Sequence, residues 1–542
     1  MQVERPIPLA EEDRQRLNAI LQEAQAGRLP EAIAGARAAL EGGLEHPLVL
    51  NLAALGLEQE GRGSEAEELL RRAVRIAPRD VGSRNALGLC LLQLQRPREA
   101  LEEFDAVLEL DPKLPYAHAN RGNALRSLGW LPEAEASFRR AIDLDSRHGA
   151  ALAAVAALAA QRGAYAQARF WAEKALAVAP GLPEAILSGA VADLGERQLE
   201  RAETSVRALL DSGALSPLDR SHAEGLLGDI LDAAGRYPEA FSAYAACNEA
   251  RQKLYAGRFD SSLEFVRGLS GWFDGPTVNA WKERPAGSSN RAGVRDHVFI
   301  IGFPRSGVTL LNTVLAGHPS VVGLERQELL IDAVHQFMAR PNLDALASAP
   351  PRVLEQFRAA YWERVAAAGV VVKDKIFVDS HSLNSLKLPL LARLFPTAKI
   401  LFACRDPRDT VLSCFRNRFG MSAPAYELLT LEGAARYYDA VLGLTLRLTN
   451  LLPLQVCLVR HEDVITAFMR EMKRVCEFLA LEWHPGMGDF ALRERDATTP
   501  MPRTSQLLHG LGTEGVGLWH HYRTYLEPTL PTLEPWVKQF YY

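Results

Sequence analysis

The 542-residue sequence predicts a helical repeat solenoid followed by an α/β domain with a mostly parallel sheet. Three observations support this fold class. Alanines recur at a 34-residue step through the first half of the chain. Short β-branched runs alternate with helical segments in the second half, as expected for strands and helices in alternation. A glycine-rich turn at residues 302–309 joins one of these predicted strands to a predicted helix.

Composition places the chain among globular proteins with two or three domains, since 48% of its residues are hydrophobic. The formal net charge of −5 argues against a general attraction to nucleic acid. We expect a cytoplasmic protein, because the N-terminal residues lack an apolar signal segment and no long apolar run predicts a transmembrane helix. The cysteines are scattered and are expected to be buried free thiols: Cys90, Cys247, Cys404, Cys414, Cys457 and Cys476.

The repeat begins near residue 13 and continues to about residue 255. One alanine marks each unit: Ala32, Ala66, Ala100, Ala134, Ala168, Ala202 and, four residues late, Ala240. A turn glycine precedes most of these alanines by five residues: Gly27, Gly61, Gly129, Gly163 and Gly235. Prolines recur at Pro78, Pro112 and Pro180, with Ser146 in the remaining place. A small residue at each helix crossing and a proline after each helix pair are typical of stacked helical hairpins.

This pattern resembles the tetratricopeptide repeat, which implies a curved stack of helix pairs. Such a stack presents an extended groove, so the repeats could recruit an acceptor peptide or protein. Asn51 and Asn85 share a register and could hold a peptide backbone there, although Ala119 occupies that register in the next unit. The alternative is a spacer or a module for homo-oligomerisation, and the sequence leaves both open.

A change in composition separates the two halves. Residues 256–293 are predicted to connect the solenoid (13–255) to the second domain (294–542), since Gly, Ser, Pro and charged residues replace apolar periodicity near Trp281–Gly293. Strands are predicted beyond this segment at His297–Ile301, Val370–Val372, Lys399–Cys404 and Gln455–Val459.

The turn after the first of these strands nearly matches a nucleotide-binding P-loop. Gly302, Gly307 and Thr309 fit the frame G-x-x-x-x-G-K-[ST], but Val308 replaces the phosphate-reaching lysine. Without that lysine, ATP or GTP hydrolysis is not expected. Arg305 lies inside the turn, which indicates a different phosphorylated donor.

A second motif runs from Ala398 to Phe419. It predicts a buried strand that ends near Arg405, followed by a helix that begins near Asp409. Arg405 and Ser413 could reach one phosphate, because ligands of open α/β sheets bind at the carboxyl ends of strands. Arg408, Arg416 and Arg418 are expected to be solvated or helix-surface charges.

Together, G-F-P-R-S-G-V-T-L-L and C-R-D-P-R-D-T-V-L-S-C-F resemble the sulfotransferase family. The similarity is strongest to bacterial members in which tetratricopeptide repeats precede the catalytic domain, and their motifs are similar to those of protein-tyrosine sulfotransferases. The resemblance implies a donor, 3′-phosphoadenosine 5′-phosphosulfate (PAPS), and transfer of its sulfuryl group to a hydroxyl or amine. His461 stands where this family usually has tyrosine, and Val308 replaces a frequent threonine.

The resemblance also assigns roles to residues. The 5′-phosphosulfate would be held by Arg305, Ser306, Gly307, Val308 and Thr309. The 3′-phosphate would be held by Arg405 and Ser413, and Ser505 would contact the donor or the leaving phosphate. Glu325 would be the general base, with Glu328 as its rival. Lys375 would steady the bridging oxygen, or Lys373 if the register shifts by two residues.

The expected chemistry is in-line sulfuryl transfer, in which the protein mainly places the reactants and stabilises charge. Less negative charge develops on a sulfuryl than on a phosphoryl group, so we expect no metal requirement. Arg305 and Lys375 would act on the departing phosphate. The acceptor hydroxyl could belong to a protein tyrosine recruited by the repeats. The alternatives are a carbohydrate or small metabolite, with the repeats serving oligomerisation, or a non-catalytic binding scaffold.

Overall fold

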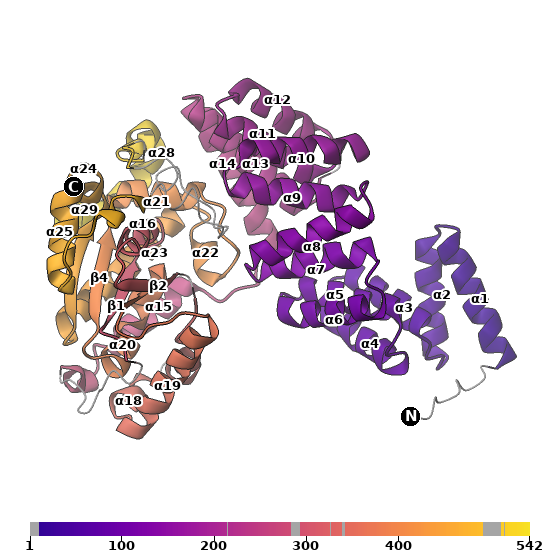
Figure 1. The fold of residues 1–542 in the computed structure, drawn as a ribbon, viewed down its shortest axis with the longest axis horizontal. Coiled ribbons are helices and arrows are strands. Elements are labelled where there is room, and N and C mark those ends of the chain that lie inside the picture. The colour runs from indigo at the N-terminus through magenta and orange to yellow at the C-terminus, as the bar shows by residue number, and fades with distance from the viewer. Residues whose placement is uncertain are drawn as a thin grey trace. The chain divides into compact units, whose positions relative to one another are not determined.

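The structure is a computed structural model, and it describes residues 10–213, 215–282, 293–325, 327–338, 342–490, 511–513 and 515–542. These residues form two compact units, with the division between Glu196 and Arg197. The first unit contains helices α1–α11, and the second contains helices α12–α15 together with the sheet and the helices around it. Figure 1 labels many of these elements, which are numbered in chain order.

Antiparallel helix pairs, followed by the single helix α11, make up the first unit. Their bounds are α1 Glu11–Gln25, α2 Leu29–Glu41, α3 Pro47–Gln59, α4 Gly63–Ile76, α5 Val81–Gln93, α6 Pro97–Leu110, α7 Pro115–Ser127, α8 Leu131–Leu144, α9 Gly149–Gln161, α10 Tyr165–Val178 and α11 Pro183–Gly195. Proline stands in the first turn of many of them, where its missing N–H costs no hydrogen bond. The predicted helical solenoid is confirmed.

The predicted alanine column lies in the second helix of each pair. Every alanine of the column, from Ala32 to Ala240, has 0% of its surface exposed. A larger side chain at these positions would separate the two helices that meet there, which explains why the period is carried by a small residue. The turn glycines that precede the column have φ between 74° and 77°, a conformation that favours glycine.

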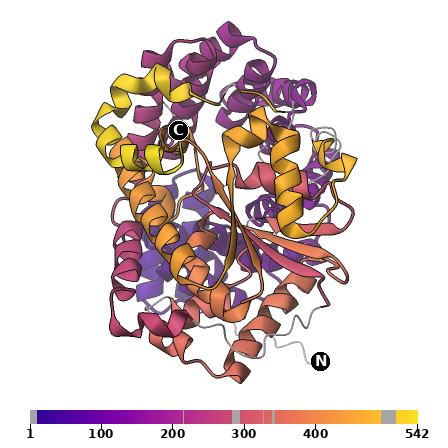
Figure 2. The same ribbon diagram turned by 90° about the vertical axis from the view of Figure 1, so that its left-hand side faces the viewer.

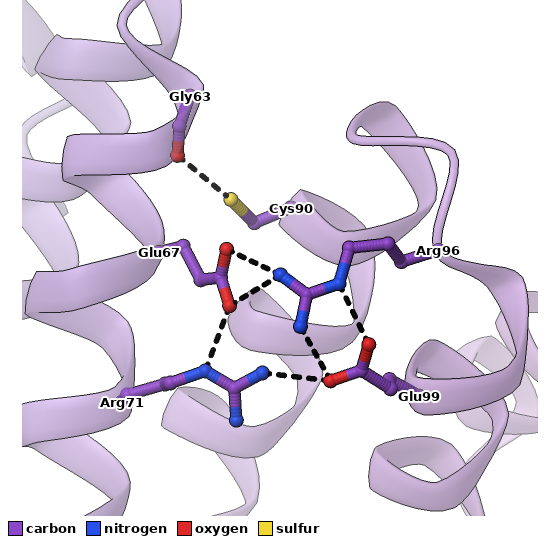
Figure 3. Close-up of polar contacts among 6 residues, drawn as sticks. All are labelled: Gly63, Glu67, Arg71, Cys90, Arg96 and Glu99. Atoms are coloured by element: carbon purple, nitrogen blue, oxygen red, sulfur yellow. Dashed lines mark hydrogen bonds and ion pairs between the residues drawn. The ribbon is translucent and has the colours of Figure 1, made fainter. Parts of the chain in front are cut away.

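Ion-pair networks connect successive repeats. Figure 3 shows the network around Glu67, which contacts Arg71 at 2.7 Å and Arg96 of the next repeat at 2.7 Å, while Glu99 contacts both arginines. The same arrangement returns in every second repeat. Glu135 pairs with Arg139 and Arg162, and Glu203 of the second unit pairs with Arg207 and Arg236. In the network of Figure 3, Cys90 donates its thiol to the carbonyl of Gly63.

The two asparagines proposed to bind a peptide contact the neighbouring repeat. Asn51 donates to the hydroxyl of Ser83 at 3.0 Å, and Asn85 accepts a hydrogen bond from Asn120 at 2.8 Å. These contacts link the first helices of consecutive repeats. A peptide-binding role for Asn51 and Asn85 stays a prediction.

The second unit contains a five-stranded parallel sheet in the order β2-β3-β1-β4-β5. The strands are β1 Asp296–Gly302, β2 Val321–Glu325, β3 Ile376–Ser380, β4 Lys399–Cys404 and β5 Gln455–Arg460. Figure 2 shows the twisted sheet with helices packed on both sides. The predicted α/β domain with a mostly parallel sheet is confirmed.

Both faces of the sheet are buried, which explains the continuous apolar run of β1. Val298 and Ile300 face α16 (Val308–Leu315) and α25 (Phe468–Leu479), whose leucines, valines and methionine complete that core. His297 and Phe299 point the other way, into an aromatic cluster with Tyr361 of α19 (Pro351–Ala367).

The predicted strand at Val370–Val372 is wrong. These residues have no regular secondary structure, and Val371 is 77% exposed. The strand of this region is β3, which begins at Ile376. The strand was predicted at the valine triplet because β-branched residues favour strands. The segment that packs between β1 and β2 is instead β3. Strand β2 was not predicted, because Gly323 interrupts its short apolar run.

The remaining helices surround the sheet or precede it. They are α12 Leu199–Asp211, α13 Pro217–Ala233, α14 Tyr237–Tyr255, α15 Ser262–Trp272, η1 Pro276–Trp281, α17 Ile331–Phe337, α18 Leu343–Ala347, η2 Ser382–Lys387, α20 Leu388–Leu394, α21 Pro407–Arg416, α22 Ala423–Glu427, α23 Leu431–Leu451, α24 His461–Thr466, η3 Pro485–Met487, η4 Leu518–Tyr522, α28 Arg523–Leu526, η5 Glu527–Thr529 and α29 Leu530–Gln539. The six cysteines are free and buried, as predicted. Among the described residues, none of the helices has the length and apolar character needed to cross a membrane.

Candidate functional site

The strand order creates a crevice at the carboxyl ends of β1 and β4. The chain leaves β1 toward β2 on one side of the sheet and leaves β4 toward β5 on the other. Ligands of open α/β sheets bind where the connections diverge in this way. Gly302 of β1 lies opposite Ala403 of β4, so the segments that follow the two strands start side by side.

The loop after β1 has an unusual backbone. Arg305 and Gly307 have φ of 70° and 101°, both in the left-handed region, and Gly307 is the N-cap of α16. A Cβ on Gly302 would lie 2.6 Å from the carbonyl oxygen of Ala403, and one on Gly307 would lie 2.8 Å from Nδ1 of His461. Only glycine fits at either position. The loop therefore presents its backbone N–H groups and the positive end of α16 toward the crevice.

Side chains of the two motifs meet across this crevice. Nε of Arg305 donates a hydrogen bond to Oγ of Ser413 in α21 at 2.9 Å. Arg405 donates to the backbone carbonyls of Arg305 at 3.4 Å and of Gly515. Residues that are about 100 positions apart in the sequence thus share one small volume. The structure brings together both predicted phosphate-binding arginines and the predicted serine.

Three buried polar atoms in this volume have no hydrogen-bond partner among the described residues. They are Oγ of Ser306, Nε of Arg405 and Nδ1 of His461. Ser306 and His461 also line a small cavity beside the loop, together with Gly307 and Leu310. Burial and the charges of Arg405 and Arg305 lower the pKa of His461 to about 3, so its imidazole is neutral at physiological pH.

Two acidic residues hold the segment that follows β4. Asp409 accepts hydrogen bonds from the backbone N–H groups of Gly517 and Trp519, at 2.7 and 2.8 Å. Glu462 accepts from the backbone N–H of Asp406 at 3.0 Å. Sequence reasoning assigned no role to Asp409, Glu462 or His461. The local capping signal after Arg405 points to a different residue, Asp406, which is the N-cap of α21 and accepts a hydrogen bond from the backbone N–H of Arg408.

Glu325 is the last residue of β2 and lies beside the loop helix. Its Oε1 accepts a hydrogen bond from Oγ1 of Thr309, in the first turn of α16. This contact brings the predicted base to the same edge of the sheet as Arg305.

Glu328, the rival base, is bound to a lysine and a histidine. It lies 2.7 Å from Nζ of Lys387 and 3.1 Å from Nε2 of His381. The hydrogen bond from His381 and the nearby Lys387 lower the pKa of Glu328 to about 2. A carboxylate with such a pKa is a weak proton acceptor near neutral pH.

Lys375 lies at the other edge of the sheet. It immediately precedes β3, whose first residue Ile376 pairs with Asp296 at the start of β1. Its Nζ donates to the carbonyl of Pro319, just before β2, at 2.6 Å. β1 has seven residues and ends at the loop, so the two edges are about 20 Å apart. Because β3 begins after Lys375, the structure does not bring Lys375 or the alternative Lys373 to the other site residues.

The carboxyl edge therefore gathers most of the predicted residues: Arg305, Ser306, Gly307, Val308, Thr309, Glu325, Arg405 and Ser413. Ser505 lies outside the described residues. Arg408, Arg416 and Arg418 were expected to be solvated or helix-surface charges, and that prediction is wrong. Each is partly buried and paired with an aspartate, Arg408 with Asp406 of its own segment, Arg416 with Asp232 of α13 and Arg418 with Asp229 of α13.

Family models match both halves of the chain. Residues 297–485 match the model described as the sulfotransferase family. Residues 17–81, 57–123 and 115–148 match models of the tetratricopeptide repeat. The sulfotransferase match covers the whole sheet and the loops that carry Arg305 and Arg405.

Similar proteins include an uncharacterized protein of Aquifex aeolicus, 22% identical over 64% of this chain and 45% of its own length. Protein-tyrosine sulfotransferase 1 of Danio rerio is 26% identical over 34% of this chain and 54% of its own length. A solved tetratricopeptide repeat protein from Parabacteroides merdae is 15% identical, covers 44% of this chain and 94% of its own length, and has a TM-score of 0.37. The chain thus spans about half the length of the first two proteins, and it combines tetratricopeptide repeats with a domain of the sulfotransferase family.

Proposed function

We propose that the protein is a PAPS-dependent sulfotransferase that moves a sulfuryl group to an acceptor hydroxyl. The observation that carries the proposal is the 2.9 Å contact between Arg305 and Ser413. It joins the loop after β1 to the helix after β4 at the topological switch of the sheet. A donor that carries phosphate groups on both the 3′ and the 5′ oxygen of one ribose needs two anion sites that close to each other.

The residues at this edge suit such a donor. The loop of Arg305, Ser306 and Gly307 offers backbone N–H groups and a guanidinium to the 5′-phosphosulfate. Arg405 and Ser413 would hold the 3′-phosphate. The partnerless Oγ of Ser306 and Nε of Arg405 are buried donors of hydrogen bonds, which an anion would satisfy.

In the reaction, the S–O bond to the donor phosphate breaks as the acceptor oxygen forms a new S–O bond. Glu325 would accept the proton of the attacking hydroxyl. Arg305 would stabilise the negative charge that collects on the leaving phosphate. We leave Lys375 out of this mechanism because it lies at the opposite edge of the sheet.

We propose a tyrosine hydroxyl of a peptide or protein as the acceptor. The support is the similarity of this chain to protein-tyrosine sulfotransferases from several animals. The repeats would recruit that protein through their groove. The protein is expected to act in the cytoplasm.

Calorimetry with 3′-phosphoadenosine 5′-phosphate tests the donor site. The wild type should bind this product, and Arg405→Ala should weaken binding at least about tenfold, since a charge-assisted hydrogen bond is lost. Lys375→Ala is the matched control and should leave the affinity unchanged. Binding of ATP in place of the product, or equal affinities for wild type and Arg405→Ala, would refute the donor assignment.

Mass spectrometry with donor and matched peptides tests the acceptor. A tyrosine peptide should gain one sulfate, and the same peptide with phenylalanine should not. Sulfation of a carbohydrate or small metabolite in extract, with no peptide product, would refute the tyrosine acceptor. Donor binding without any product would indicate a scaffold.

A further inference from the structure

Helix α21, which carries Ser413, ends against the last repeat pair, α13 and α14. Nδ2 of Asn248 in α14 donates to the backbone carbonyl of Phe415 at 2.8 Å, and Arg251 donates to the carbonyl of Phe419. Asn248 and Arg251 are 3% and 5% exposed. The last carbonyls of a helix have no partner within the helix. The side chains of Asn248 and Arg251 supply hydrogen-bond donors to carbonyls at the end of α21 and in the segment after it.

Ion pairs fix the same end of α21. Arg416 lies 2.6 Å from Asp232 and donates to the hydroxyl of Tyr244 at 3.2 Å. Arg418 lies 2.8 Å from Asp229, whose other oxygen accepts from Tyr244 at 3.0 Å. The second oxygen of Asp232 accepts from Tyr522 in η4. Arg416 is thus held between the carboxylate of Asp232 and the rings of Tyr244 and Tyr522, and Arg418 is held by the carboxylate of Asp229.

Close packing leaves little freedom at this contact. Phe241 of α14 stacks on Phe415 with ring centres 5.3 Å apart and on Tyr525 with ring centres 3.8 Å apart. A Cβ on Gly225 of α13 would lie 2.6 Å from Cδ of Arg418. A helix end held by hydrogen bonds, ion pairs and stacked rings cannot shift without breaking several of them.

We propose that α13 and α14 are part of the donor site, in that they position α21 and thereby the Ser413–Arg305 contact. Ser413 lies one helical turn before Arg416, so a shift of the anchored end moves its hydroxyl away from Nε of Arg305. Asp232 and Asn248 are positioning residues in this view. The inference rests on the proposed function, because it assigns α21 to donor binding.

The test compares Asp232→Asn with Glu203→Gln in the full chain. Both variants remove one carboxylate charge from an ion-pair network of the last repeats, but only Asp232 contacts α21. Asp232→Asn should raise Kd for 3′-phosphoadenosine 5′-phosphate about tenfold, and KM for the donor similarly, because a buried arginine loses its partner. KM for the acceptor should stay unchanged. Glu203→Gln should leave every one of these constants unchanged.

A purely structural role would lower the folded fraction, and with it the apparent kcat, without changing Kd or KM. Phe241→Leu is the second variant. It keeps an apolar side chain, loses the stacking on Phe415, and should also raise Kd. Unchanged product binding in folded Asp232→Asn or Phe241→Leu would overturn the inference. Absence of binding in the wild type would instead refute the proposed function.

Discussion

Glu325 and Glu328 lie three residues apart but have different surroundings. Glu325 accepts a hydrogen bond from Thr309 at the loop helix, whereas Glu328 is bound to Lys387 and His381. A general base needs both reach to the acceptor and a pKa that lets it hold a proton transiently. Glu328 does not meet the second requirement, because its pKa is too low for it to accept a proton near neutral pH.

Glu325→Gln should therefore lower kcat by a factor of about 10² to 10⁴, the usual contribution of a general base. Affinity for 3′-phosphoadenosine 5′-phosphate should persist, because Glu325 is not among the proposed phosphate ligands. Glu328→Gln is the matched control and should keep kcat within a few-fold of wild type. A steady-state assay with saturating donor measures kcat for both variants. A larger loss of kcat in Glu328→Gln than in Glu325→Gln would identify Glu328, not Glu325, as the general base.

Asp379 of β3 is a buried carboxyl group on the aromatic face of the sheet. It accepts hydrogen bonds from Tyr361 at 2.9 Å and from Asn384 at 3.3 Å. Burial nevertheless raises the pKa of Asp379 from 3.8 to about 6. Between these two pH values the folded protein keeps a proton that the unfolded chain has released. Rising pH in that window therefore reduces stability, and the contribution is lost above the folded pKa.

The variant Asp379→Asn should remove this dependence. Relative to Asp379→Asn, the wild type should lose about 2 kcal/mol of unfolding free energy between pH 4 and pH 7. Urea unfolding of both proteins at a series of pH values measures the difference. His297, whose pKa burial lowers to about 3, is present in both proteins, so its opposite contribution cancels. Parallel stability curves for the two proteins would contradict the prediction.

At the scale of secondary-structure elements, the turn before the second helix of each repeat has the same left-handed backbone conformation, whether the residue there is glycine or not. Most repeats place glycine before the second helix, but Gln95 and Arg197 stand at the equivalent positions with φ of 60° and 63°. Side chains with a Cβ are strained there. The local backbone is thus set by the stacking of the helices rather than by the residue in the turn.

Gln95→Gly should stabilise the array by about 0.5–1 kcal/mol, because it relieves this strain while adding some freedom to the unfolded chain. Gly129→Ala, the reverse change in the following repeat, should destabilise by a similar or larger amount. Urea midpoints followed by circular dichroism measure both. Destabilisation by Gln95→Gly would mean that the glutamine side chain contributes contacts that outweigh the backbone strain.

The placement of β3 shows where sequence reasoning reached its limit at this scale. Val370–Val372 has the stronger β propensity, yet Ile376–Ser380 is the strand, because only that segment fills the space between β1 and β2. This shift of a few residues moves Lys375 from the predicted carboxyl end of a strand to the amino end of β3. The role of Lys375 was assigned by the family resemblance, which carries no information on where the strand begins.

For the whole molecule, the division into compact units determines which residues can be deleted without disrupting the domain that contains the sheet. The segment predicted as a connection, 256–293, would allow residues 1–255 to be deleted as a block. The compact unit that contains the sheet begins instead at Arg197 and includes α13 and α14. These helices bind the carbonyls and arginines at the end of α21.

Deletion of residues 1–196 should therefore leave a folded protein that binds 3′-phosphoadenosine 5′-phosphate. Deletion of residues 1–255 removes both aspartate partners of Arg416 and Arg418 and the ring that stacks on Phe415. Unpaired buried charges are costly, so we expect this protein to be insoluble or to lose product binding. Circular dichroism and calorimetry compare the two truncations. Wild-type affinity in the shorter protein would show that α21 holds its place without the repeats.

The sequence by itself determined the solenoid, its register and the two segments that are proposed to bind the donor. Those features are local: a small residue recurs wherever two helices cross, and glycine or arginine follows a buried strand. Only the tertiary structure decided where β3 begins, that Arg305 meets Ser413, and that the last repeat anchors α21. Asn248 and Phe415 are 167 positions apart, and neither carries a local signal of the other. Contacts of that kind arise from packing, which depends on every element between the two residues.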